Sequence, residues 1–295
     1  NQDLTFKGMV TFLNNLGIHA SETKAFLNSF GMFNKEGKYN RIAYLLSDQN
    51  EMIVKVMRFK GTDKNDFDQR LTYDNQSLIL TVKEVLDYFK LINKPRKIDA
   101  EAGTRLETPL FDYQSFREAW INACVHTTWT ENIPPSVYLY DDRIEVVSYG
   151  GLPFGLSKEG FYTGTSKPVN NRLFNIFITC DFTEQSGHGI PRIVDHYGRE
   201  AFSFNDGLLK VTIPYGYVPD YVLARQARNK IIDILTDNQR NVLHYLADNP
   251  YSSLQAVADS CSLSLGGVKK IVGKLQEMEL LERKGPKNNP QWIVR

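Results

Sequence analysis

The first hundred residues alternate between helical and strand-like spacing of their apolar side chains. Residues 6–16 and 21–30 repeat apolar positions at helical intervals, whereas residues 52–59 (MIVKVMRF) are typical of a strand. Residues 77–92 follow as an amphipathic helix. Residues 93–103 are rich in Pro, Gly and charge, which is typical of a connection or an edge segment. The pattern therefore predicts a small α+β region over residues 1–100.

Residues 101–217 mix the two spacings again and add glycine-containing turns. In chain order, the pattern predicts a helix at 114–126, strands at 137–140 and 144–148, a helix at 172–179 and a strand at 208–214. A tight Asp-Asp-Arg turn joins the first two strands, and YGGLP ends the second. This order predicts helices layered on one face of a sheet, which is a two-layer α/β sandwich within an α+β fold.

Residues 236–295 carry three short helical patterns followed by two short apolar strands. The helices are expected at 238–247, 252–261 and 268–278, and the strands flank a basic Gly, Pro and Asn tip in LLERKGPKNNPQWIV. This arrangement resembles the winged-helix superfamily, in which the third helix enters the major groove of DNA and the wing contacts its backbone. Residues 218–235 are expected to form a helical connector.

The composition indicates a globular protein of two or three domains. The chain has 295 residues, of which 42% are hydrophobic and 23% charged, unlike a disordered chain. No apolar run approaches the roughly 18 residues that a bilayer needs, and the first residues lack a signal-peptide pattern. We therefore expect a cytoplasmic protein without a membrane partner. The spacing of Cys124, Cys180 and Cys261 favours neither a disulfide framework nor a zinc site.

Positive charge is concentrated at the C-terminus. The chain has a net charge of +1, but residues 262–295 hold seven basic and three acidic side chains, which gives +4 there and −3 elsewhere. A local basic excess indicates a polyanionic partner, so DNA is the expected partner. Protein contacts or dimerisation are the alternative use of this domain. The candidate DNA-binding residues are Ser264, Gly267, Lys269, Lys270 and Lys274 on the third helix and Arg283, Lys284 and Lys287 on the wing.

A narrow polar stripe runs along the predicted helix at 114–126. At about 100° per residue, Glu118, Asn122 and His126 fall within an arc of about 80°, and apolar side chains cover the far side. Such a helix is mostly buried, so its stripe must face either a polar cleft or solvent.

Two glycine-containing turns follow this helix in the sequence. Gly150 and Gly151 end a strand, while Gly187 and Gly189 lead into a helix that has Pro191 in its first turn. Glycine lets the backbone approach a ligand closely, and a helix N-terminus offers unpaired N–H groups to phosphate. Together with the polar stripe, these turns predict a phosphate-binding cleft.

Three segments in this order resemble one protein family. FREAWINACVH, DDRIEVVSYGGLP and EQSGHGIPRI are similar to the motifs of the GHKL ATPase superfamily, which includes gyrase, heat-shock chaperone, histidine kinase and mismatch-repair ATPase domains. The similarity is to a divergent branch labelled as predicted transcriptional regulators or ATP-dependent helicase-related proteins, and it covers residues 1–217. Full-length members often begin with a Schlafen-like domain, which this chain lacks. Because the chain also begins without Met, we expect a fragment of a longer protein.

The resemblance implies roles for the polar stripe and identifies ATP and Mg²⁺ as the expected cofactors. Glu118 corresponds to the residue that polarises the attacking water, and Asn122 to the ligand of the Mg²⁺ ion that bridges the phosphates. His126 lies one turn further along the helix, within reach of phosphate or of the lid, the family's loop that covers the nucleotide. Residues 163–171 correspond to that lid, in which Lys167 is a candidate phosphate contact.

The resemblance also assigns the glycine turns to two family motifs. Gly150 and Gly151 correspond to the first glycine box, beside the adenine base. Gly187 and Gly189 correspond to the second glycine box, at the phosphates. All four are therefore expected to line the nucleotide site.

The sequence departs from the family pattern at two places. Where the superfamily anchors adenine through Asp, and this branch commonly through Asn, the chain has Ser148, whose hydroxyl has less reach and no charge. Where the branch has Arg-Asp-Tyr after His126, the chain has Thr127, Thr128 and Trp129. The fold follows from the motifs, but ATP hydrolysis does not.

These observations leave three functions open. The first is a DNA-binding transcriptional regulator whose GHKL-like module binds, or once bound, a nucleotide. The second is a Mg²⁺-dependent ATPase that acts on DNA, based on Glu118 and Asn122. The third is a degenerate GHKL-like scaffold through which the chain associates with itself as a homodimer.

Overall fold

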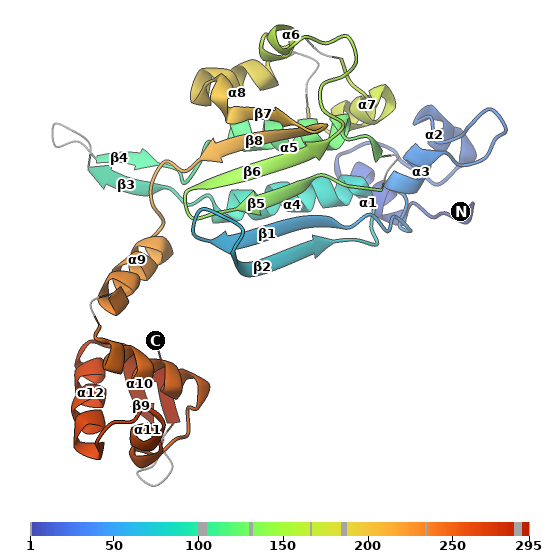
Figure 1. The fold of residues 1–295 in the computed structure, drawn as a ribbon. Coiled ribbons are helices and arrows are strands. Elements are labelled where there is room, and N and C mark those ends of the chain that lie inside the picture. The colour runs from blue at the N-terminus through green and yellow to red at the C-terminus, as the bar shows by residue number, and fades with distance from the viewer. Residues whose placement is uncertain are drawn as a thin grey trace. The chain divides into compact units, whose positions relative to one another are not determined.

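The computed structural model describes residues 2–99, 105–129, 132–165, 167–183, 188–233, 235–285 and 291–294. Its helices and strands follow one another as Figure 1 shows. The chain divides into two compact units, Asn1–Val218 and Pro219–Arg295.

A six-stranded mixed sheet forms the centre of the first unit, with the strand order β2-β1-β5-β6-β8-β7. Its strands are β1 Val54–Lys60, β2 Asp66–Tyr73, β5 Ser136–Leu139, β6 Arg143–Tyr149, β7 Phe202–Asn205 and β8 Leu208–Pro214. β1 pairs with β5 in parallel, and the other neighbouring strands pair antiparallel. The segment before residue 100 therefore shares its sheet with the segment that follows.

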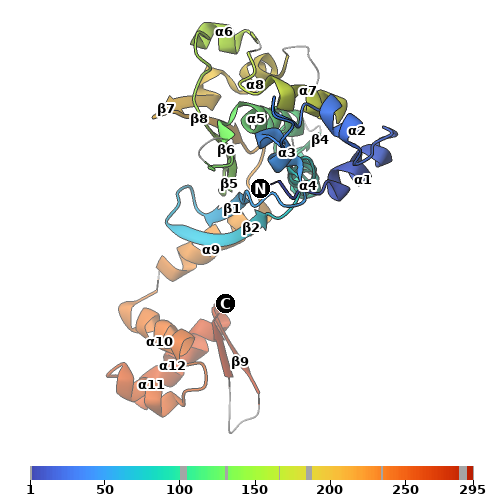
Figure 2. The ribbon, with the colours of Figure 1, turned by 90° about the vertical axis from the view of Figure 1, so that its right-hand side faces the viewer.

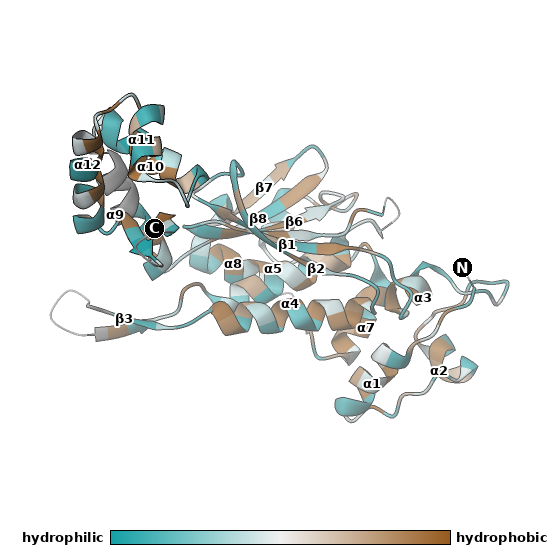
Figure 3. Cartoon of the chain, turned by 90° about the horizontal axis from the view of Figure 1, so that it is seen from below, coloured by the Kyte–Doolittle hydropathy of each residue, from teal (hydrophilic) through white to brown (hydrophobic). Residues whose placement is uncertain are grey.

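Helices pack on one face of this sheet. Figures 2 and 3 show α4 and α5 lying along that face, so the unit is the two-layer α/β sandwich that the sequence predicts. One continuous hydrophobic core joins helices and strands, and it includes Met9, Val56, Phe89, Trp120 and Ile144. The helices are α1 Lys7–Asn15, α2 Lys24–Ser29, α3 Arg41–Leu46, α4 Leu78–Ile92, α5 Tyr113–His126, α6 Lys158–Tyr162, α7 Asn171–Thr179 and α8 Gly189–Tyr197, and η2 Arg199–Ala201 is a 3₁₀ turn.

Helix α5 is held firmly at its start and along its apolar side. Asp112 caps it by accepting a hydrogen bond from the backbone N–H of Ser115 at 2.9 Å. Phe116 stacks on Phe89 of α4 with ring centroids 3.9 Å apart, and Trp120 is fully buried. This packing fixes the direction in which the polar stripe of α5 points.

The structure contains strands that the hydrophobic pattern did not predict. β3 Arg96–Asp99 and β4 Arg105–Thr108 pair as a separate two-stranded sheet, and Figure 1 shows them extending from the main sheet. β3 lies in residues 93–103, which were predicted to be a connection or an edge segment. The edge strand β2 is largely exposed, so it has no apolar alternation to detect. These segments become strands because they form backbone hydrogen bonds with a neighbouring strand, not because their own sequence shows an alternating apolar pattern.

The second unit is a winged helix with a hydrophobic core of its own, which contains Val242, Leu246, Val268, Leu275 and Trp292. Thr236 caps α10 with a capping box. Ser264 caps α12, which begins at Leu265, three residues earlier than the apolar pattern predicts. The elements of this unit are α9 Asp220–Asp233, α10 Asp237–Asp248, α11 Leu254–Ser260, α12 Leu265–Glu277, β9 Leu281–Lys284 and β10 Gln291–Val294.

Two properties of the described residues bear on the expected partners. None of the helices in that part of the chain is long and apolar enough to cross a membrane. The same residues contain no group of three or more His, Cys, Asp or Glu side chains placed to hold a metal ion. All three cysteines are free thiols, and burial raises the pKa of Cys180 to about 12.

Candidate functional site

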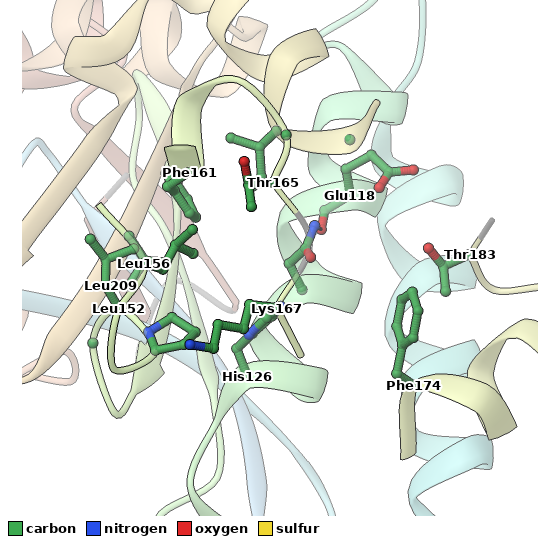
Figure 4. A pocket seen from close by; sticks show the side chains of 16 residues that line it. Glu118, His126, Leu152, Leu156, Phe161, Thr165, Lys167, Phe174, Thr183 and Leu209 are labelled. Carbon is green, nitrogen blue, oxygen red and sulfur yellow. Dashed lines mark hydrogen bonds between the residues drawn. The ribbon is translucent and has the colours of Figure 1, made fainter. Parts of the chain in front are cut away.

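A pocket lies over the polar stripe of α5. Glu118, Asn122 and His126 form one wall. The rest of the lining is mainly apolar and includes Leu152, Leu156 and Phe161, which Figure 4 shows on the same side of the pocket. The stripe thus lines a partly open pocket rather than a flat solvent-exposed surface. The cavity encloses about 80 Å³, which is room for several water molecules.

The carboxylate of Glu118 lies against the first residue of α8. A Cβ atom added to Gly189 would come within 2.2 Å of Glu118 Oε2, so a methyl group there would displace the carboxylate. On the other side, Arg117 Nη1 lies 3.5 Å from Glu118 Oε1, and Arg117 Nη2 donates to the Asp181 carbonyl at 3.1 Å. Glu118 is therefore placed between a guanidinium group and a helix N-terminus.

Asn122 is oriented by a hydrogen bond within its own helix. Its Nδ2 donates to the carbonyl of Glu118 at 2.8 Å. That bond fixes the amide so that its side-chain oxygen is left to accept a hydrogen bond or to ligate a cation. An amide oxygen is a suitable ligand for a hard divalent ion.

His126 lines the far end of the pocket from Glu118. Its Nδ1 atom is buried and has no hydrogen-bond partner. Burial lowers the pKa of His126 to about 4, so the imidazole is neutral near pH 7. Leaving a buried polar atom unpaired costs about 1–3 kcal/mol.

The turn after β6 requires its two glycines for local reasons. Gly150 has a φ of 123° and donates from its N–H to the Gly207 carbonyl at 2.8 Å. A Cβ atom on Gly150 would lie 2.9 Å from Thr128 Cγ2. Gly151 has a φ of 61° and lines the pocket, whereas Gly150 packs beside it.

Lys167 and Ser148, which were also predicted to bind the nucleotide, form hydrogen bonds with backbone carbonyls of the chain. Lys167 lines the pocket, but its Nζ donates to the Phe154 carbonyl at 2.6 Å. Ser148 is buried on β6 and donates to the Leu209 carbonyl at 3.5 Å, and the pocket lining does not include it. Gly187 lies outside the described residues. The structure therefore brings together Glu118, Asn122, His126, Gly151, Lys167 and Gly189, but not Ser148 or Gly150.

A second, more polar cavity of about 360 Å³ shares Glu118, Thr183 and Gly189 with the first. It adds Arg117 and Arg192, which were missed in the sequence because no pattern linked them to the stripe. Arg192 Nε lies 3.4 Å from Asp112 Oδ2. Burial raises the pKa of Asp112, but hydrogen bonds from Ser115 and Arg192 outweigh it, so the pKa ends below its usual value. This basic cavity adjoins the end of the pocket that Glu118 occupies.

The candidate DNA-binding residues of the winged helix divide into two groups. Lys269, Lys270 and Lys274 are exposed on α12, whereas Ser264 accepts from the N–H of Gly267 at 3.1 Å and serves as a helix cap. On the wing, the Arg283 guanidinium lies 5.7 Å from the centre of the Trp292 ring, and Lys284 Nζ lies 3.9 Å from Glu282 Oε1. Lys287 lies outside the described residues.

Two families match separate parts of the chain. Residues 133–208 match the family described as "Putative ATP-dependent DNA helicase recG C-terminal". Residues 235–282 match "Winged helix-turn-helix DNA-binding". The predicted resemblance is confirmed. The recG-like match includes the glycine turn and Gly189 but begins after α5, so it leaves out Glu118 and Asn122.

A solved structure has the same fold over nearly the whole chain. It is the crystal structure of the DIP2311 protein from Corynebacterium diphtheriae, with a TM-score of 0.57 and 16% sequence identity. The alignment covers 99% of this chain and 63% of that one, so this chain spans under two thirds of its length. Identity this low shows the fold alone. A search of curated proteins found no match.

Proposed function

We propose that this protein is a DNA-binding transcriptional regulator whose pocket on α5 binds an adenine nucleotide and whose winged helix binds DNA. The observation that carries the proposal is the convergence of Glu118, Asn122 and Gly189 on one pocket, next to a cavity that contains two arginines. The recG-like match over residues 133–208 supports a nucleotide as the ligand.

The two neighbouring cavities, which share Glu118, Thr183 and Gly189, suit the two parts of a nucleotide. Apolar side chains such as Leu152 and Phe161 line the pocket beside His126, where a planar base would be buried favourably. Arg117, Arg192 and the N-terminus of α8 lie at the Glu118 end, where they favour phosphate. The nucleotide is therefore oriented with its phosphates toward Gly189.

The residues at the phosphate end also fit a magnesium ion. The side-chain oxygen of Asn122 remains available because its Nδ2 is committed to the Glu118 carbonyl. When bound, Mg²⁺ neutralises phosphate charge. Asn122 would hold it, while Arg117 and Arg192 would supply the remaining positive charge around the phosphates.

The winged helix is proposed to bind DNA mainly through phosphates. The first two turns of α12 have the sequence LGGVKKIV, which contains no Arg, Asn or Gln to recognise base edges. Lys269 and Lys270 are exposed and suit phosphate oxygens instead. We therefore expect weak sequence preference and strong salt dependence.

Regulation requires that nucleotide and DNA binding affect each other. The test is the dissociation constant for duplex DNA, measured by fluorescence anisotropy with and without ATP and Mg²⁺, together with ATP affinity from calorimetry. Coupling between two sites typically changes affinity about 5-fold to 150-fold. Asn122→Ala should lose both ATP binding and the ATP effect on DNA.

A matched control is Asn175→Ala, which changes an exposed asparagine on α7 outside the pocket. It should bind ATP as the wild type does. No ATP binding at millimolar concentration with Mg²⁺ would contradict the nucleotide site. Equal DNA affinity with and without ATP would leave a DNA-binding protein without nucleotide regulation.

Glu118 favours a second candidate, a Mg²⁺-dependent ATPase acting on DNA. Its carboxylate lies at the phosphate end, where it can orient a water molecule for attack. Phosphate release from ATP, measured with and without DNA, tests this function. Glu118→Gln should abolish ATP turnover while keeping ATP binding. Absence of turnover in the wild type would contradict the ATPase, and the transcriptional regulator would remain as the proposed function.

A further inference from the structure

His126 carries an unsatisfied atom that the roles assigned to the pocket do not explain. Among the described residues, the buried side-chain polar atoms without a partner are Ser77 Oγ, His126 Nδ1 and Thr127 Oγ1. Of the three residues that carry these atoms, only His126 lines the pocket. Buried polar atoms are nearly always paired, so an exception on a pocket wall indicates a missing ligand group.

The position of His126 restricts what that group can be. Eight residues of helix rise about 12 Å, so His126 and Glu118 lie at opposite ends of the pocket. The basic cavity adjoins Glu118 and does not include His126. His126 is therefore far from the arginines that favour phosphate.

The expected base anchor does not occupy this end of the pocket. Ser148 donates to the Leu209 carbonyl and is absent from the lining. The neighbouring wall consists of apolar side chains that include Leu152, Leu156 and Leu209. A base buried there would have His126 as a polar neighbour, since the Nζ of Lys167, which also lines the pocket, already donates to the Phe154 carbonyl.

We propose that His126 is the residue that recognises the nucleoside part of the bound nucleotide, through a hydrogen bond between Nδ1 and the base or ribose. This inference rests on the proposed nucleotide binding. Because burial lowers the pKa of His126 to about 4, the neutral ring offers one N–H and one lone pair. A neutral imidazole suits an uncharged nucleoside better than a phosphate.

The experiment compares ATP with inorganic tripolyphosphate, which lacks the nucleoside. Dissociation constants with Mg²⁺ are measured by calorimetry for the wild type, His126→Leu and His126→Asn. His126→Leu should weaken ATP binding about tenfold or more and tripolyphosphate binding less than about twofold. His126→Asn keeps a polar atom near the place of Nδ1 and should restore ATP affinity to within about threefold of the wild type.

Thr127→Val is the matched control, because it removes the neighbouring unpaired hydroxyl, which lies outside the pocket lining. It should leave ATP affinity unchanged, and thermal melts should show that every variant is folded. Equal losses for ATP and tripolyphosphate, or no loss in His126→Leu, would overturn the inference while nucleotide binding stands. If tripolyphosphate binds too weakly to measure, failure of His126→Asn to restore ATP affinity overturns it. Failure of the wild type to bind ATP would instead refute the proposed function.

Discussion

The pocket of the first unit is assembled from α5, the turn after β6 and the start of α8, whereas the candidate DNA contacts of the second unit lie mainly on the exposed face of one helix, α12. In the pocket, the carboxylate of Glu118 on α5 lies against Gly189, which comes from a distant stretch of the chain. On α12, the lysines are defined by exposure and charge. A buried site therefore depends on long-range packing, and an exposed site depends on local sequence.

The largest effect is expected from removing positive charge on α12. Lys269→Ala, Lys270→Ala and Lys274→Ala together should weaken DNA binding on the order of 100-fold and lower the slope of log affinity against log salt by about 3. ATP affinity should not change. The control neutralises the exposed Lys83 and Lys90 of the first unit. An unchanged slope in the triple variant would argue for protein contacts by the winged helix.

A smaller effect should follow from a single methyl group in the pocket. Gly189→Ala would push the Glu118 carboxylate away, because the added Cβ would lie 2.2 Å from Oε2. ATP affinity should fall about 30-fold, because the methyl group would keep phosphate away from the N–H groups at the start of α8, and hydrogen bonds to a charged group are worth about 1.5–3 kcal/mol. The free energy of unfolding should stay equal or rise slightly, since alanine suits a helix better. Calorimetry and urea unfolding measure the two quantities. Unaltered ATP affinity would show that the ligand does not approach Gly189.

The cap of α5 should contribute to stability in a pH-dependent way. Asp112→Ala should lower the free energy of unfolding at pH 7 by about 1–2 kcal/mol. The folded pKa of Asp112 lies below its ordinary 3.8, so its contribution is present above pH 3.8 and is lost as pH falls through the folded value. Urea unfolding at pH 7 and pH 3 should therefore show a smaller difference at the lower pH. An equal cost at both pH values would assign the effect to packing alone.

The smallest effect is expected from the corresponding cap in the second unit. Thr236→Ala removes the capping box of α10 and should cost about 1 kcal/mol in the unfolding of the winged helix. DNA affinity should change little, because Thr236 lies outside the exposed lysine group. A differential scanning experiment that resolves the two units measures this cost. If the first unit melted lower as well, the units would be coupled.

Sequence predicted the elements that carry strong apolar periodicity. The helix at 114–126 and the strand at 144–148 match α5 and β6 closely, because their apolar faces are buried in the core. The exposed edge strand β2 and the hairpin of β3 and β4 escaped prediction, since pairing partners define them. Apolar periodicity in the sequence arises where one face of an element is buried, so exposed strands show little of it.

The candidate site was predictable only in part for a related reason. Helical spacing placed Glu118, Asn122 and His126 on one face, and the structure places them on one pocket wall. The same reasoning could not show that Ser148 would turn to the Leu209 carbonyl, or that Arg192 would reach the Glu118 end from α8. Those positions depend on β8 and α8, which no local pattern relates to α5.

The parallel pairing of β1 with β5 has a consequence for how the chain folds. Val56 meets Val137 across this pair, so the centre of the sheet closes only after a long intervening segment has been synthesised and brought back. Contacts of such sequence separation slow folding, and until they form the edges of β1 and β5 are open to other chains. During synthesis the first unit should need protection from aggregation longer than the winged helix, whose neighbouring elements find one another quickly. A chain cut at residue 100 would keep that vulnerability permanently.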